Sequence, residues 1–174
     1  MPDQINAYTQ LQQMLHAWRV KRQTIALVPT MGALHAGHLA LVREAKKHAQ
    51  AVVVSIFVNP AQFGANEDFN KYPRMLEQDI EMLGEEGIDV VWAPGVGEMY
   101  PENFATMVHV GGPSLGLDDD FRPGHFDGVA TVVSKLFHQI QPHVALFGEK
   151  DYQQLCVINR LVTDMNIDIE IIGV

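Results

Sequence analysis

Two histidines three residues apart carry the clearest chemical signal in the sequence. His35 and His38 belong to the stretch PTMGALHAGH (29–38), which follows an apolar run and opens a helical pattern. Free N–H groups at a helix start attract phosphate, and the helix dipole adds to this attraction. An imidazole can donate a hydrogen bond to the same anion, or a proton when it is charged. Gly37 leaves room for a ligand close to the backbone. We interpret the stretch as a nucleotide-binding turn; the alternative is a glycine-rich turn with two surface histidines.

A zinc site is a weaker interpretation of the same histidines. Zinc needs three or four ligands, and no Cys or Glu stands at motif spacing from His35 and His38.

Two further segments place polar residues after expected strands. Gln62, in FVNPAQFG (57–64), offers a donor and an acceptor suited to a ligand with hydroxyl and carboxylate groups. Taken alone, an Asn-Pro turn with a solvated Gln is the better interpretation of that segment. In RPGHF (122–126), Arg122 is either a cation near an anionic ligand or a surface residue of a rigid turn. The local sequence does not decide between these two.

The stretch FGEKDYQQ (147–154) repeats the arrangement of a strand end, a glycine and a helix start. Lys150 is a compact cation suited to phosphate. Asp151 can accept hydrogen bonds from ribose hydroxyls. Asp151 and Gln154 also have the spacing of a capping box. The alternative to ligand binding is therefore that both only cap the helix. The sequence leaves ligand binding and capping open.

These segments must be positioned by an α/β fold with a parallel sheet, because apolar runs alternate with helical patterns. The first helix is expected to be capped by Thr9 and Gln12. The expected helices cover 8–21, 37–50, 73–86, 126–140 and 152–165. The expected strands cover 25–29, 51–58, 89–93, 144–147 and 169–172, with a further short strand at 106–110 and a loop at 111–124. In such sheets ligands bind at the carboxyl ends of the strands, where all the segments above lie.

Composition excludes several classes of protein. The 174 residues suit one domain, and 47% of them are hydrophobic. A net charge of −9 disfavours binding to a nucleic-acid backbone. The single cysteine, Cys156, cannot form an internal disulfide. Neither a membrane-spanning run nor a signal-peptide pattern is present. We therefore expect a soluble cytoplasmic protein without a membrane or nucleic-acid partner.

Taken together, the segments resemble the pantothenate synthetase, or pantoate–β-alanine ligase, family from about Ile25 onward. His-x-Gly-His alone marks only the wider nucleotidyltransferase superfamily, and the combination of motifs is far more specific. The matching stretches are VPTMGALHAGH (28–38), VVVSIFVNPAQF (52–63), RPGHFDGV (122–129), VSKLF (133–137) and FGEKDYQQL (147–155).

The resemblance implies a Rossmann-like parallel sheet flanked by helices and a two-step, ATP-dependent reaction. Pantoate and ATP would give pantoyl adenylate and pyrophosphate, and β-alanine would then displace AMP to form pantothenate. The implied catalytic residues are His38 (the proton donor), His35 and Lys150. The implied ATP-binding residues are Met31, Gly32, Ala33, Leu34, His35, Ala36, Gly37, His38, Gly148, Glu149, Lys150 and Asp151. Pantoate would contact Gln62 and Gln154, and β-alanine would contact Gln62. Mg²⁺ would accompany ATP, with Asp79 as the candidate ligand, and the protein would form a homodimer.

The resemblance also implies a C-terminal lid domain carrying a Ser-Ser-Arg-Asn segment that closes over ATP. No such segment occurs in the chain. We therefore expect residues 1–174 to be an N-terminal nucleotide- and pantoate-binding domain with impaired turnover. Two rivals are an adenylyltransferase of the same fold, which would have no reason to carry FVNPAQF or FGEKDYQQ, and a nucleotide-binding module without turnover.

Overall fold

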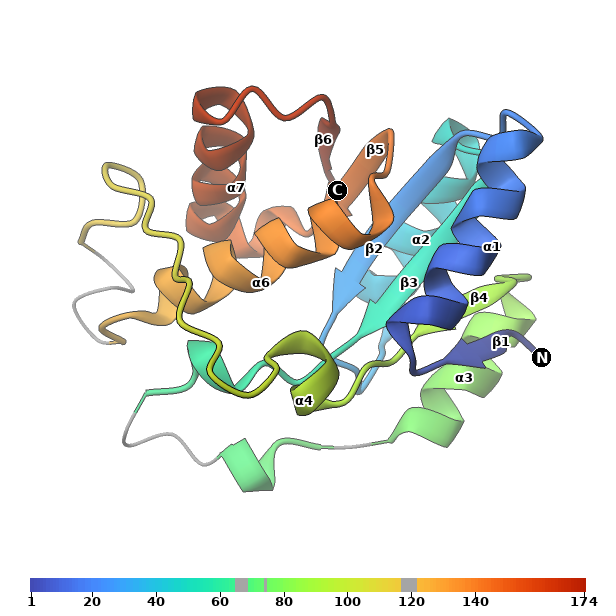
Figure 1. The fold of residues 1–174 in the computed structure, drawn as a ribbon, viewed down its shortest axis with the longest axis horizontal. Helices are drawn as coiled ribbons and strands as arrows, with labels where there is room; N and C mark the ends of the chain where they lie inside the picture. Colours follow the sequence, from blue (N-terminus) through green and yellow to red (C-terminus); the bar gives the residue numbers. More distant parts are fainter. Residues whose placement is uncertain (65–68, 74, 117–121) are drawn as a thin grey trace.

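The computed structural model describes residues 1–64, 69–73, 75–116 and 122–174, and within them the chain forms one parallel sheet (Figure 1). The strand order is β1-β4-β3-β2-β5-β6, and each neighbouring pair is parallel. The strands are β1 (Asp3–Ile5), β2 (Ile25–Thr30), β3 (Ala51–Ile56), β4 (Val90–Trp92), β5 (Val144–Phe147) and β6 (Glu170–Gly173). The predicted α/β class and parallel sheet are confirmed.

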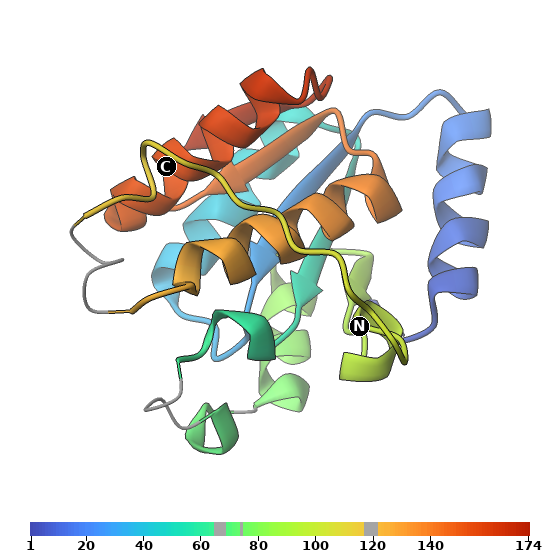
Figure 2. The same ribbon diagram turned by 60° about the vertical axis from the view of Figure 1, so that its left-hand side comes forward.

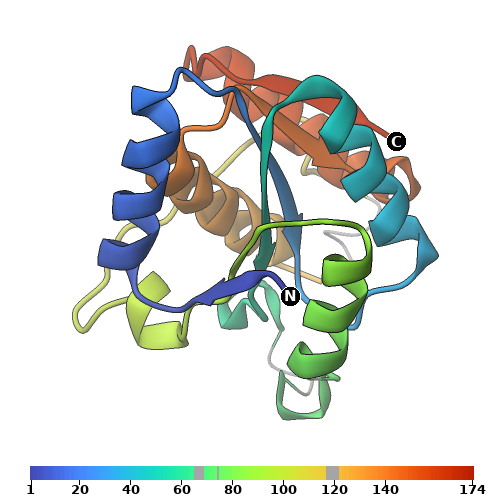
Figure 3. The ribbon, with the colours of Figure 1, turned by 90° about the vertical axis from the view of Figure 1, so that its right-hand side faces the viewer.

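Helices cover both faces of this sheet (Figure 3). Helices α1, α6 and α7 pack on one face, and α2 and α3 pack on the other. The helices are α1 (Tyr8–Val20), α2 (Ala36–His48), α3 (Leu76–Glu85), α4 (Val96–Met99), α6 (His125–Ile140) and α7 (Tyr152–Asp164). Short 3₁₀ helices are η1 (Pro60–Gln62), η2 (Phe69–Lys71) and η3 (Glu149–Asp151). No helix in the described part of the chain is long and apolar enough to span a membrane.

The position of β2 inside the sheet explains why residues 25–28 are all apolar. Ile25 and Leu27 pack into the core beneath α1 and α6, whereas Ala26 and Val28 pack into the core beneath α2. Because successive side chains point to opposite faces and both faces are covered, positions 25–28 must be apolar.

The carboxyl end of β2 lies at the topological switch point of the sheet. Strand β2 pairs with β3 on one side and with β5 on the other. Helix α2, which follows β2, covers one face, and α7, which follows β5, covers the opposite face. The loops that follow β2 and β5 therefore diverge and leave a crevice between them, which is the usual ligand site of an open α/β sheet.

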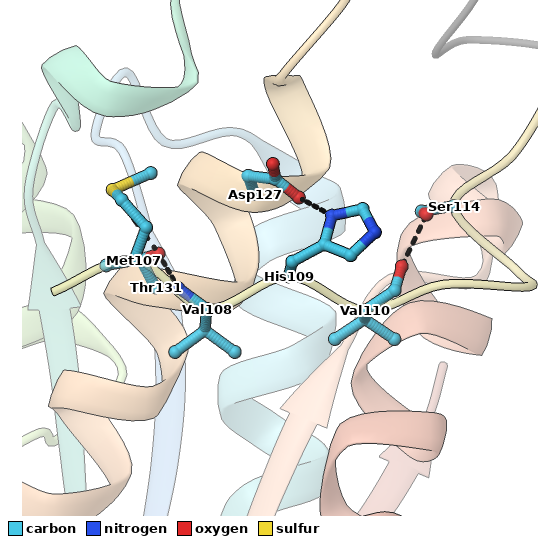
Figure 4. Close-up of polar contacts among 7 residues, drawn as sticks. All are labelled: Met107, Val108, His109, Val110, Ser114, Asp127 and Thr131. Carbon is cyan, nitrogen blue, oxygen red and sulfur yellow. Dashed lines mark hydrogen bonds and ion pairs between the residues drawn. The ribbon is translucent and has the colours of Figure 1, made fainter.

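The predicted strand at 106–110 is wrong. The segment is extended and runs along α6 (Figures 2 and 4). The Val108 N–H donates to Thr131 Oγ1 at 2.9 Å, and His109 Nδ1 lies 2.8 Å from Asp127 Oδ1. The Ser114 hydroxyl donates to the Val110 carbonyl. Hydrogen bonds of this segment are thus made with α6 side chains and within its own loop, whereas a strand would need a neighbouring backbone.

The predicted start of the first helix and of α3 also needs correction. Ala7 is the N-cap residue of α1 and no side chain caps it; Glu98 Oε1 accepts a hydrogen bond from the Tyr8 N–H at 2.7 Å instead. A distant carboxylate therefore replaces the predicted Thr9–Gln12 capping box. Helix α3 begins at Leu76 and not at position 73. Strand β1 and helix α4 were not predicted, and positions 117–121 of the predicted loop lie outside the described residues.

Candidate active site

The loops after β2, β3 and β5 meet around a cavity of about 360 Å³. The sequence-predicted residues that line it are Met31, His35, Gly37, His38, Gln62, Gly148, Lys150, Asp151 and Gln154. Five predicted ATP-binding residues do not line it: Gly32, Ala33, Leu34, Ala36 and Glu149. Arg122, which the sequence left open, is half-buried and is also not among the lining residues. The fold thus brings most of the predicted site together from segments more than a hundred residues apart.

The two histidines are oriented by the start of α2. His35 is the N-cap residue, and its Nδ1 accepts a hydrogen bond from the Gly37 N–H at 3.1 Å. His38 Nδ1 accepts from the His35 N–H at 3.3 Å, and the two ring centroids are 4.1 Å apart. A nitrogen that accepts is unprotonated, so in each neutral ring the proton is on Nε2. The pair therefore offers two Nε2–H donors from the first turn of one helix.

The ring of His35 also explains the glycine in the motif. A Cβ at position 37 would lie 2.9 Å from His35 Cε1, which is too close for a real contact. Gly37 therefore lets the His35 ring keep its position, because a side chain at 37 would force the end of that ring to move.

His38 is poised to be neutral near pH 7. Partial burial lowers its pKa below the ordinary value, and the adjacent His35 lowers the pKa further, whereas Asp79 and Asp151 act in the opposite direction. A neutral Nε2–H stabilises an anion by donating a hydrogen bond and has no need to carry a charge. This electrostatic state suits a group that holds phosphate oxygens.

Gln62, which also lines the cavity, is held in a fixed orientation. Its side chain is buried, and its Oε1 accepts a hydrogen bond from Asn59 Nδ2 at 3.1 Å. Asn59 Oδ1 in turn accepts from the Tyr100 hydroxyl at 2.7 Å and from the Ala61 N–H at 3.2 Å. Because Oε1 is occupied in this way, the Gln62 Nε2 donor is the group left to face a ligand; its present partner is Met31 Sδ at 3.1 Å. A ligand oxygen would be a stronger acceptor than this thioether.

The helix α6 supports Gln62 through direct backbone contact. Asn59 Nδ2 donates to the Gly128 carbonyl at 3.0 Å, and His125 Nδ1 lies 2.9 Å from the Gln62 carbonyl. A Cβ at Gly128 would lie 2.3 Å from the Ala61 carbonyl oxygen. The 3₁₀ helix η1 therefore packs on α6 at a distance that only glycine allows.

The loop after β5 presents Lys150 and Asp151 to the same cavity. Asp151 is the N-cap residue of α7, yet its side chain makes no capping hydrogen bond and is exposed. The capping-box alternative for Asp151 is therefore not observed. Gln154 follows in the first turn of α7, is half-buried and lines the cavity.

An apolar wall completes the cavity, and sequence reasoning did not assign it. Val129, Val132, Val133 and Leu136 come from one face of α6, and Phe147 comes from the end of β5. All five are at most 7% exposed. Asn59, in the segment that the sequence predicts to be an Asn-Pro turn, also lines the cavity and is 1% exposed. No signal in the sequence marks it, because its burial depends on the tertiary structure.

Asp79, the candidate metal ligand, accepts hydrogen bonds from backbone N–H groups. It is 2% exposed in the first turn of α3. Its Oδ2 accepts from the Ala33 N–H at 2.9 Å and its Oδ1 accepts from the Leu34 N–H at 2.8 Å. Among the described residues, no group of three or more His, Cys, Asp or Glu side chains could hold a metal ion.

Comparison with known proteins decides the family. The sequence matches the pantoate-beta-alanine ligase family over residues 3–174. The chain belongs to this family. Two pantothenate synthetases, from Mesorhizobium japonicum and Neisseria meningitidis, are 53% and 60% identical to it over 172 and 162 residues. These alignments cover 99% and 92% of the chain but only 61% and 58% of the relatives. The chain thus spans about three fifths of the length of these ligase-family members.

Solved structures of the ligase family share the fold. Pantothenate synthetase from Thermus thermophilus superposes with a TM-score of 0.93 at 50% identity, covering the whole chain and 61% of that structure. Pantoate-beta-alanine ligase from Francisella tularensis superposes with a TM-score of 0.94 at 38% identity, covering the whole chain and 67% of that structure. The Francisella structure is described as a complex with "Beta-gamma ATP" and beta-alanine.

Proposed function

We propose that this chain is the nucleotide- and pantoate-binding domain of an enzyme that joins pantoate to β-alanine at the expense of ATP. One observation carries the proposal: a single cavity is lined by the anion donors His35, His38 and Lys150, by the oriented amide of Gln62 and by an apolar wall from α6. Membership of the pantoate-beta-alanine ligase family, and the ATP and β-alanine named for the Francisella relative, support the same substrates.

The reaction would proceed in two displacements. In the first, a carboxylate oxygen of pantoate bonds to the α-phosphorus of ATP, and the bond to the bridging oxygen of pyrophosphate breaks. In the second, the amine of β-alanine attacks the acyl carbon of pantoyl adenylate and loses a proton. The bond from the acyl carbon to the bridging oxygen breaks, and AMP departs with that oxygen. The products are pantothenate, AMP and pyrophosphate.

The two histidines and Lys150 suit the leaving pyrophosphate. His35 and His38 would donate from Nε2 to phosphate oxygens, and Lys150 would add a positive charge. Negative charge grows on the pyrophosphate as the bond to the α-phosphorus lengthens, so these fixed donors stabilise the transition state more than the bound ATP. Exposed Asp151 would accept hydrogen bonds from ribose hydroxyls.

Gln62, Gln154 and the apolar wall from α6 suit pantoate. Pantoate has a carboxylate and two hydroxyl groups, and one of its carbons carries two methyl groups. Gln62 Nε2 would donate to an oxygen of the acid, with Gln154 as a further polar contact. The methyl groups would pack on Val132, Val133 and Leu136, where removal of apolar surface from water favours binding. Gln62 would also contact the incoming β-alanine.

Mg²⁺ would enter with ATP as part of the substrate. Among the described residues no group of three or more His, Cys, Asp or Glu side chains could hold Mg²⁺, and each oxygen of Asp79 already accepts a hydrogen bond from a backbone N–H. Mg²⁺ bound to nucleotides commonly keeps several waters and relies on phosphate oxygens, so no protein cage is required.

The decisive test is the dependence of AMP and pyrophosphate release on each substrate. Pyrophosphate release that requires pantoate, followed by AMP release that requires β-alanine, supports the ligase. Release with a phosphorylated acceptor instead would support an adenylyltransferase, and ATP binding without product would support a binding module. In the full-length protein, His38→Ala should lower adenylate formation by about two to four orders of magnitude, with a much smaller effect on ATP affinity.

A lid domain and a homodimer, both implied by the resemblance, and a cytoplasmic location, expected from the composition, belong to the same proposal. The 174-residue chain should bind ATP and pantoate but turn over feebly, because lid closure completes such sites and excludes water. Light scattering at micromolar concentration should give the mass of a dimer.

A further inference from the structure

Asp79 is a buried carboxylate that no step of the proposed reaction uses. It does not line the cavity that contains the histidines; it lines a neighbouring cavity of about 320 Å³. A carboxylate that is 2% exposed must be compensated by strong hydrogen bonds, since burial of an isolated charge is costly. Its two partners, the N–H groups of Ala33 and Leu34, lie 46 and 45 residues away in the sequence, in the loop that precedes the histidines.

This loop has a conformation that needs such support. Gly32 and Ala33 are consecutive residues with positive φ, at +83° and +52°. Glycine adopts this region freely, but alanine there is strained because its Cβ approaches the backbone. Strained residues persist where surrounding contacts over-determine them. The charge-assisted bonds from Ala33 and Leu34 to Asp79 are contacts of this kind.

The loop is held at three successive N–H groups. The Gly32 N–H donates to Thr30 Oγ1 at 3.2 Å, and the Thr30 hydroxyl donates to the Ser55 carbonyl at 2.8 Å. A Cβ at Gly32 would lie 3.0 Å from Asp79 Oδ2, which is tight enough that the carboxylate would have to shift. The chain then continues directly into His35, the N-cap residue of α2.

We propose that Asp79 is a positioning residue of the nucleotide site: its carboxylate clamps the Gly32–Leu34 turn and thereby sets where His35 and His38 meet the triphosphate. The role rests on the proposed function, in which the two histidines serve the departing pyrophosphate. Asp79 acts through the loop and touches neither substrate. Because a misplacement of about 1 Å can cost on the order of a hundredfold in rate, the clamp matters mainly for turnover.

The first test needs no substrate. Asp79→Asn keeps the shape of the side chain, but its Nδ2 would face one of the two N–H donors, so one bond is lost. Hydrogen exchange of the Ala33 and Leu34 amides, followed by NMR in the 174-residue chain, should accelerate at least tenfold. The matched control is Glu77→Gln, which removes an exposed carboxylate from the same first turn of α3 and should leave both exchange rates unchanged. Unchanged exchange in Asp79→Asn would overturn the clamp.

The second test measures turnover in the full-length protein. Asp79→Asn should lower kcat for pantoate-dependent pyrophosphate release by about ten- to a hundredfold, while KM for ATP and pantoate changes less than about threefold. The Mg²⁺ concentration that gives half-maximal activity should not move. A normal kcat, or a rise in the required Mg²⁺ with normal amide exchange, would overturn the proposal, the latter in favour of a metal ligand.

A second variant keeps the test decisive if Asp79→Asn folds poorly. Adding Ala33→Gly removes the strain of the left-handed residue, so the double variant should regain part of the lost thermal stability and of kcat. A double variant no better than Asp79→Asn would contradict a role through the turn. Wild-type protein without pantoate-dependent pyrophosphate release would refute the proposed function, whereas the amide-exchange result would still decide the clamp.

Discussion

The contact between Gly128 and η1 provides a sharp test of how Gln62 is positioned. In Gly128→Ala, the new Cβ would lie 2.3 Å from the Ala61 carbonyl oxygen and 2.6 Å from Gln62 Cα. An ordinary contact of this kind is 3.4–4 Å, and both neighbours are backbone atoms that cannot rotate away. Helix α6 and η1 must therefore separate by about 1 Å, which moves Gln62 and its partner Asn59 together.

The cost of this change combines three effects. Overpacking typically destabilises by about 1–3 kcal/mol, and loss of the Asn59–Gly128 hydrogen bond adds about 1 kcal/mol. Alanine in a helix regains about 1 kcal/mol relative to glycine. The net loss is about 2 kcal/mol, which corresponds to a fall in Tm of roughly 4–8 °C for a chain of this size. Displacement of Gln62 should also weaken pantoate binding by about tenfold or more, because the donor no longer meets the acid.

Thermal melts and pantoate titration calorimetry on the 174-residue chain measure both effects. The control is Gly97→Ala in α4, where a Cβ would meet nothing within 4 Å; it should be as stable as the wild type or more stable by up to about 1 kcal/mol. A Gly128→Ala variant with wild-type Tm and wild-type pantoate affinity would refute the argument that this close contact sets the position of Gln62.

Three further predictions concern charge. Lys150→Met should raise the Kd for ATP by about tenfold in calorimetry while pantoate affinity is retained, because one charge-assisted contact to phosphate is lost. Gln62→Glu should weaken pantoate binding by at least about a hundredfold with little change for ATP, since it places a carboxylate opposite the substrate carboxylate; equal losses for both ligands would contradict this. The pKa of His38 is lowered on folding, so the unfolded chain binds more protons below about pH 6.5, and stability should fall as the pH decreases through that range. His38→Asn should flatten this dependence in melts between pH 5 and about pH 7.5, and an identical pH profile would show that His38 does not contribute.

Much of the fold could be predicted because it depends on local patterns. Uninterrupted apolar runs such as 51–58 indicate strands buried on both faces, and helical periodicity between them indicates a parallel sheet. Short segments could not be predicted for the same reason. Strand β1 is three residues long, which is too short for a pattern. The segment 106–110 has strand-like residues, but in the described structure it bonds to side chains of α6 and forms no strand. The start of α1 could not be predicted because its capping carboxylate, Glu98, is 90 residues away.

The sequence by itself determined the chemistry that the site can offer: two histidines at a helix start, a lysine after a strand, and a glutamine after another strand. Side-chain type and spacing are local, and they constrain hydrogen bonding wherever the chain folds. Only the tertiary structure decided which of these groups face one cavity, because that depends on strand order and on distances between remote segments. The tertiary structure packed α6 against Gln62 at Gly128. It left the Asp151 side chain without a capping hydrogen bond and at the cavity. It also directed both oxygens of Asp79 to backbone N–H groups of the loop that carries the histidines. No local pattern records a hydrogen bond between residues 33 and 79, since the two meet only when α3 packs on the sheet.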